Sequence, residues 1–318
     1  MKPTPGTGQR LAILHQCTSC WCRGDIQMVM TTPHGYKQDC MKGKSDMRLA
    51  YSTLACPRWT VEEAVAAAVR YGYDAIEWRL ADGAIIEPDT PVSVRRRLRE
   101  VSAANGIAIA CLDTSCRVVQ PSPEERTAVI EAAKRMIDMA AELGAPLLRV
   151  FGGPLPGGTT HSMLLAPTAE VLHAICTYAA TRNITAVLET HDAWSTSVDV
   201  LKLIQTAASP AARVLWDIHH TFRAGEAPAQ SVAMLGSAIA HVHVKDGRSS
   251  SSSPGTWELC LLNEGTVPLR EGCSALRHSG YDGYLSLEWE KQWHPEIAEP
   301  EIALLQAVPL LRRFWHEG

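Results

Sequence analysis

The chain has 318 residues, of which 46% are hydrophobic and 20% are charged, and its formal net charge is −4. This composition is typical of a soluble globular protein, and the charge offers no basic surface for nucleic acid or an anionic membrane. No apolar run approaches the roughly 20 residues of a membrane span, and the start lacks an apolar signal core, so we expect a cytoplasmic protein. Ten cysteines scattered among core-like segments indicate reduced thiols rather than a disulfide framework.

Residues 1–46 differ in composition from the rest of the chain. They have no sustained helical or strand period and are rich in Pro, Gly, Thr and Lys. Their cysteines are Cys17, Cys20, Cys22 and Cys40. A C-x-x-C pair is half of a zinc site, but no matching second pair follows. We predict that residues 1–46 are a disordered or non-native extension and that residues 47–318 form the folded domain.

From residue 48 onward, predicted strands alternate with predicted helices. The strands are expected at 49–54, 75–78, 107–112, 147–151, 186–189, 214–217, 239–244 and 284–287. The helices are expected at 60–71, 91–104, 123–143, 168–182, 197–208, 228–235, 269–279 and 299–314. Such alternation implies parallel strands with right-handed crossovers. Eight units of this kind match the size of a closed (β/α)8 barrel, the TIM barrel.

Two long loops follow the fourth and seventh predicted strands. Residues 152–167 contain two Gly-Gly pairs, and residues 247–256 contain five consecutive serines. Their composition predicts mobile segments, which fits either a lid over the strand ends or a solvated surface loop. No G-x-G-x-x-G follows the first strand, which argues against an open dinucleotide-binding sheet.

Four successive predicted strands each end in ionisable residues. The relevant residues are Glu189, Asp217, His243 and Glu288. The carboxyl ends of barrel strands meet at one face, where active sites are built. Three carboxylates and one imidazole repel one another unless a cation is present, so the pattern predicts a metal site. The alternative is four isolated polar strand ends.

The ligand types favour a particular class of metal. Oxygen-rich ligation with one imidazole and no thiolate suits Mn²⁺, Co²⁺ or Mg²⁺ better than structural Zn²⁺, although Zn²⁺ can compete by affinity. Other polar residues near the strand ends are candidates for substrate contact. These are His191, His220, Arg149, Lys245 and Asp246. Lys245 can stabilise an enolate oxygen or a phosphate, with Asp246 orienting it, or the two can form a surface ion pair of little consequence.

Several strings resemble the sugar phosphate isomerase/epimerase superfamily of xylose isomerase-like TIM barrels. The strings are VLET, LWDIHH, HVHVKDG, LLNEGTVPL and GYLSLEWE. The superfamily includes ketose 3-epimerases, inosose isomerases and dehydratases, and distantly endonuclease IV. The resemblance covers the chain from about Arg48 to its end. It implies that Glu189, Asp217, His243 and Glu288 bind one divalent metal and that His220 contacts substrate oxygens.

Some residues depart from subgroups of this superfamily. The run Val244 to Gly247 is closer to inosose-handling members than to the ketose 3-epimerases, and Asn263 replaces a family-like glycine. The extra histidine ligands of endonuclease IV are missing, because the corresponding strands offer Glu77 and Asp113. Together with the acidic net charge, this argues against a DNA-repair enzyme.

We therefore predict a metal-dependent isomerase or epimerase for a sugar, sugar phosphate or cyclic polyol ketone. Glu189 and Glu288 are the expected catalytic residues, moving a proton next to a carbonyl through an enediolate. The alternatives are a lyase of inosose-dehydratase type and a non-catalytic, metal-stabilised carbohydrate-binding barrel. The expected partner is a small carbohydrate, without nucleic acid or membrane, and a homodimer is left open.

Overall fold

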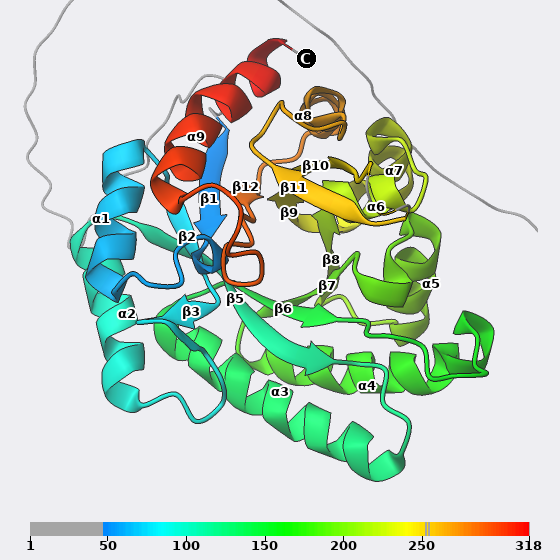
Figure 1. Ribbon diagram of the computed structural model, residues 1–318. Coiled ribbons are helices and arrows are strands. Elements are labelled where there is room, and N and C mark those ends of the chain that lie inside the picture. Colours follow the sequence, from blue (N-terminus) through cyan, green and yellow to red (C-terminus); the bar gives the residue numbers. More distant parts are fainter. Residues whose placement is uncertain (1–46, 252, 254, 318) are drawn as a thin grey trace, which may run out of the picture. The chain divides into compact units, whose positions relative to one another are not determined.

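The computed structural model describes residues 47–251, 253 and 255–317. Within them, eight parallel strands close into a barrel in the order β1-β12-β9-β8-β7-β6-β5-β2. The strands are β1 (Arg48–Ser52), β2 (Ala75–Trp78), β5 (Ala108–Arg117), β6 (Leu147–Phe151), β7 (Thr185–Glu189), β8 (Ala212–Asp217), β9 (Ile239–Val244) and β12 (Tyr284–Leu287). Helices surround this ring of strands (Figure 1). The prediction of a (β/α)8 barrel is confirmed.

Apart from α4, which begins early, and the short α6, which was not predicted, the helices begin and end close to the predicted residues. They are α1 (Val61–Tyr71), α2 (Val92–Ala104), α3 (Pro123–Leu143), α4 (His161–Thr181), α5 (Ser197–Ala207), α6 (Ile218–Arg223), α7 (Pro228–Leu235), α8 (Leu269–His278) and α9 (Pro300–Glu317). Short 3-10 turns cover Thr53–Ala55, Asp192–Trp194 and Gly236–Ala238. A capping box of Thr60 and Glu63 begins α1, and Gly72, with a φ of 85°, ends it in the left-handed conformation.

Both long loops contain regular structure that the sequence analysis missed. Helix α4 begins at His161, seven residues earlier than predicted, because the Thr160 side chain accepts the amide of Met163 and caps the helix. The loop after β9 folds into an antiparallel ribbon of β10 (Asp246–Ser249) and β11 (Trp257–Cys260). A second ribbon joins β3 (Leu80–Ala81) and β4 (Ala84–Ile85). Composition alone hid these pairings, since they depend on contacts across the loops.

The interior of the barrel is layered from apolar to charged. Near the amino ends of the strands lie small residues such as Ala75, and the next layer holds Cys111, Val187 and Leu215. Successive inward positions of a strand are two residues apart. The layer above therefore consists of charged residues, which are Glu77, Asp113, Glu189 and Asp217, all fully buried.

Among the described residues, one helix, α4, is long and apolar enough by length and composition to cross a membrane. The sequence analysis expected no such run. In the structure, 39% of its apolar window is buried, and the helix packs against β7 and β8 between α3 and α5. Its place in the ring of barrel helices accounts for its apolar character.

The predicted extension, residues 1–46 with Cys17, Cys20, Cys22 and Cys40, lies outside the described residues. The domain boundary at residue 47 therefore stays a prediction. The cysteines that the structure describes form no disulfide with one another.

Candidate active site

Four of the predicted site residues converge at the carboxyl ends of β7, β8, β9 and β12. Glu189, Asp217, His243 and Glu288 are buried, and one ligand atom of each lies within 4.8 Å of those of the others. The Nδ1 atom of His243 is 3.5 Å from Glu189 Oε1, 3.9 Å from Asp217 Oδ2 and 3.4 Å from Glu288 Oε2. Barrel closure thus brings together residues from four separate strands.

The cluster contains polar atoms that suit a metal ion. Glu189 Oε1 and His243 Nδ1 are buried without a hydrogen-bond partner among the described residues, and Asp217 Oδ2, which faces them, forms an ion pair with Lys245 at 2.9 Å. Buried polar atoms are nearly always satisfied, so two unsatisfied atoms facing a third carboxylate oxygen call for a ligand. Carboxylate oxygens and one imidazole nitrogen are donors that Mn²⁺, Co²⁺ and Zn²⁺ accept. The residues present therefore fit a divalent cation.

Lys245 places a positive charge among the same carboxylates. Its Nζ donates to Glu288 at 2.5 Å and to Glu290 at 2.6 Å, and lies 2.9 Å from Asp217 Oδ2. The side chain is only 1% exposed, so this is not the surface ion pair considered from the sequence. Lys245 supplies part of the countercharge that the acidic cluster requires.

The surrounding charges set the protonation of the cluster. Burial favours the neutral form of Glu189, but Arg149, whose Nη1 donates to Glu189 Oε2 at 2.7 Å, brings its pKa to about 2. Burial acts likewise on Glu288, yet His243 and Lys245 hold its pKa well below the usual range. For Asp217 burial prevails and raises the pKa to about 6. These charges therefore keep Glu189 and Glu288 ionised.

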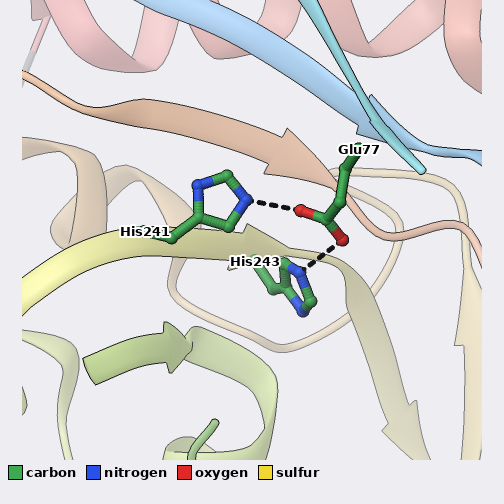
Figure 2. A group of neighbouring side chains, drawn as sticks. All are labelled: Glu77, His241 and His243. Atoms are coloured by element: carbon green, nitrogen blue, oxygen red, sulfur yellow. Dashed lines mark hydrogen bonds and ion pairs between the residues drawn. The ribbon is translucent and has the colours of Figure 1, made fainter. Parts of the chain in front are cut away.

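Glu77, at the end of β2, orients the imidazole of the cluster. Its Oε1 is 2.8 Å from Nε2 of His243, and its Oε2 pairs with Nε2 of His241 (Figure 2). This bond leaves Nδ1 of His243 facing the carboxylates. The sequence analysis assigned no such role to Glu77. The signal available was the H-x-H spacing, which puts both imidazoles on one face of β9.

We expect Glu77→Gln to weaken divalent metal binding about 10- to 100-fold, because carboxylates that orient a ligating histidine have effects of this size. Calorimetric titration with MnCl₂ measures the dissociation constant of the metal. Glu226→Gln is the matched control, since Glu226 accepts bonds from Ser197 and Ser231 rather than from His243. An unchanged dissociation constant in Glu77→Gln would contradict an orienting role.

The remaining predicted substrate contacts divide into two groups. Arg149 and His191 line a cavity above the cluster. His220, in the first turn of α6, lies beside the cluster, and its Nε2 is 3.2 Å from Lys245 Nζ. Burial, followed by the charge of Lys245, holds the pKa of His220 well below its usual range, so its ring is neutral.

Asp246 has a different position from the one predicted. Its carboxylate accepts the backbone amides of Gly247, Asn263, Gly265 and Val267, at 2.8 to 3.2 Å. It does not line the cavity that holds Arg149 and His191. Asp246 therefore holds the loop after β11 in place, and the substrate contact predicted for it stays a prediction.

The cavity has a volume of about 410 Å³ and opens at the carboxyl ends of the strands. Its lining includes Glu288, Glu290, Arg79 and Arg117, of which the sequence analysis identified only Glu288 as a site residue. Of the tryptophans near the strand ends, Trp293 lines the cavity and is 49% exposed. Trp194, Trp216 and Trp289 are core residues.

Comparisons with known proteins agree with the architecture. A family model described as xylose isomerase-like TIM barrel matches residues 65–311. A fructoselysine 3-epimerase from Shigella flexneri is 23% identical over 276 residues, covering 84% of this chain and 97% of the relative.

Two solved structures show the same fold. A D-allulose 3-epimerase from Methylomonas sp., solved in complex with D-allulose, has a TM-score of 0.68 and 19% identity, covering 84% of this chain and 97% of that chain. A protein from Bacillus anthracis, named as the probable 3-DHS dehydratase, has a TM-score of 0.65 and 18% identity. The match covers 81% of this chain and 97% of that chain.

Proposed function

The chain belongs to the xylose isomerase-like TIM barrel family, and we propose that it is a divalent-metal-dependent isomerase or epimerase of a sugar, sugar phosphate or cyclic polyol ketone. The observation that carries the proposal is the convergence of Glu189, Asp217, His243 and Glu288 beside a cavity of about 410 Å³. A cavity of this size suits a small polar molecule. The epimerases among the similar proteins support the reaction class.

We assign the metal to these four residues. Mn²⁺, Co²⁺ or Mg²⁺ suits three carboxylates and one imidazole, and Zn²⁺ remains an alternative. A bound divalent ion supplies Lewis acidity, which polarises a carbonyl and acidifies the neighbouring C–H. Because Arg149 holds Oε2 of Glu189, the oxygen that faces the cluster is Oε1.

Glu189 and Glu288 are the residues that move the proton. Both are ionised, and they approach the cluster from β7 and from the end of β12. One carboxylate removes the proton next to the carbonyl, which produces an enediolate. The other carboxylate, once it has taken a proton from solvent, delivers that proton to the opposite face or the neighbouring carbon, and the first carboxyl group releases its proton to solvent. Lys245 donates to Glu288 and can stabilise the negative oxygen of the enediolate. His191 and His220 provide contacts for substrate hydroxyls.

A lyase is the second candidate, and Lys245 favours it. Its ammonium group lies beside Glu288, where it can give a proton to a departing β-hydroxyl after Glu288 has formed the enolate. The C–O bond then breaks, the electron pair of the enolate forms the new double bond, and water leaves. The dehydratase among the solved structures of this fold is consistent with this alternative.

Incubating the metal-loaded protein with ketoses and cyclic polyol ketones in deuterated water tests the proposal. Isomerisation or epimerisation incorporates deuterium at the carbon next to the carbonyl, which mass spectrometry and NMR detect. Loss of water identifies the lyase. Tight metal and ligand binding without exchange or water loss would contradict both and favour a non-catalytic binding barrel.

A further inference from the structure

The two sides of the cavity carry opposite charges. Glu288 and Glu290 line one side, next to the cluster of Glu189, Asp217 and His243. Three arginines line the other side, and they come from three adjacent strands: Arg79 directly follows β2, Arg117 ends β5 and Arg149 lies in β6. A substrate in this cavity therefore meets a positive wall as well as the acidic cluster.

The three arginines differ in how far their charges are neutralised. Arg149 is paired with Glu189 at 2.7 Å and lies 3.7 Å from Asp113. Among the residues that the structure describes, Arg79 has only Glu87 within ion-pair distance, at 3.8 Å, and Arg117 has no ion pair within 4 Å. The charge of Arg117 therefore has no ion-pair partner on this wall, and that of Arg79 has a single, long one.

Arg79 is held rigidly, although the carboxylate nearest to it, that of Glu87, is 3.8 Å away. The residue is 6% exposed, its Nη2 donates to Ser115 Oγ at 2.7 Å, and its Nη1 lies 3.5 Å from the carbonyl oxygen of Asp113. Burial and, next, repulsion by Arg149 lower its pKa. A buried guanidinium without a close anion is unfavourable, and an anionic ligand would offset that cost.

Arg117 completes this wall from a defined position. The end of β5 departs from regular pairing with β6 between Asp113 and Arg117, and both Ser115 and Arg117 line the cavity. Gly153, with a φ of 94°, packs on the stem of Arg117, where an added Cβ would lie 3.2 Å from the Arg117 Cβ. The glycine allows the loop after β6 to pack against the side chain of Arg117. Arg117 as a whole remains exposed to solvent.

We propose that the cavity accepts a sugar or polyol that carries an anionic group, a carboxylate or a phosphate, bound by Arg79 and Arg117. The inference rests on the proposed function, since it assigns the substrate class of the same site. The carbonyl end of the substrate then faces Glu189 and Glu288. The opposite orientation would put the anion against four carboxylates, which are Glu189, Asp217, Glu288 and Glu290. Guanidinium groups bind carboxylate and phosphate through charge-assisted hydrogen bonds.

Titration with three stable ligands of one carbon skeleton tests the proposal. D-Glucitol is neutral, D-gluconate carries a carboxylate and D-glucitol 6-phosphate carries a phosphate. Calorimetry on the full chain, with and without added MgCl₂, is expected to show about 10- to 100-fold tighter binding of at least one anion than of D-glucitol. Which anion binds tighter identifies the group.

Replacing the two arginines tests whether they cause the preference for an anionic ligand. Arg117→Gln and Arg79→Gln are each expected to reduce the preference for the anion by about tenfold or more while leaving the affinity for D-glucitol nearly unchanged. Arg135→Gln is the matched control, because it removes the same charge from an exposed position on the outer helix α3. Arg117 is exposed, so Arg117→Gln is informative even if Arg79→Gln unfolds.

Equal affinities for all three ligands, failure of both anions to bind, or a preference that survives Arg117→Gln would overturn the inference. These titrations need no turnover, so they separate it from the proposed function. An anion preference in a protein that exchanges no deuterium would uphold the anionic subsite and reject the isomerase. Deuterium exchange with neutral ketoses, together with equal affinity for neutral and anionic ligands, would uphold the isomerase and reject the anionic subsite.

Discussion

Glu288→Gln is expected to lower turnover by about 10² to 10⁴, the usual contribution of a general base. Glutamine keeps an oxygen that can coordinate a metal but loses the carboxylate that accepts the proton. Metal binding should weaken yet remain saturable, so turnover is compared at saturating Mn²⁺. The measurement is the rate of deuterium incorporation into a substrate identified by the incubations with ketoses and cyclic polyol ketones.

Glu290→Gln is the matched control for this change. Glu290 lies two residues further along, donates no atom to the four-residue cluster and accepts a bond from the same Lys245 at 2.6 Å. Its replacement should cost much less turnover than Glu288→Gln. If Glu288→Gln regains nearly full activity at saturating metal, Glu288 is a ligand only, and Lys245 is the next candidate for the proton transfer.

Lys245→Met is expected to lower the free energy of unfolding of the metal-free protein by about 3 to 5 kcal/mol. Lys245 is buried among Asp217, Glu288 and Glu290, and its loss leaves these carboxylates without their nearest cation. Added MnCl₂ should restore much of the loss, because a ligand that binds only the folded state stabilises it by mass action. Urea denaturation with and without MnCl₂ measures both effects.

Lys291→Met separates this rescue from a general effect of losing a buried lysine. Lys291 is also buried, but its Nζ bonds to the carbonyl oxygens of Pro295 and Ile297 and pairs with Glu299 at 3.0 Å. Its replacement should destabilise the protein without a compensating response to MnCl₂. Equal rescue of both variants, or of neither, would contradict a shared role of Lys245 and the metal in neutralising the cluster.

Local patterns were sufficient to predict most of the elements. The capping box of Thr60 and Glu63 and the glycine at position 72 define α1 through contacts within a few residues, and such signals are present in the sequence itself. The ribbon of β10 and β11 was missed because its stability comes from pairing across a serine-rich loop. The early start of α4 at His161 was missed because loop composition concealed the Thr160 cap.

The sequence by itself determined the alternation of strands and helices and the charged residues at the strand ends, because period, caps and strand ends are local properties. Only the tertiary structure decided which partner each charge has. Glu77 and His241 are 164 positions apart and meet because the barrel closes. In the same way, closure places Lys245 among the carboxylates, and among the described residues it leaves Arg117 without an ion pair and Arg79 with only the 3.8 Å pair to Glu87. Electrostatic partners depend on distance in space, which no local pattern encodes.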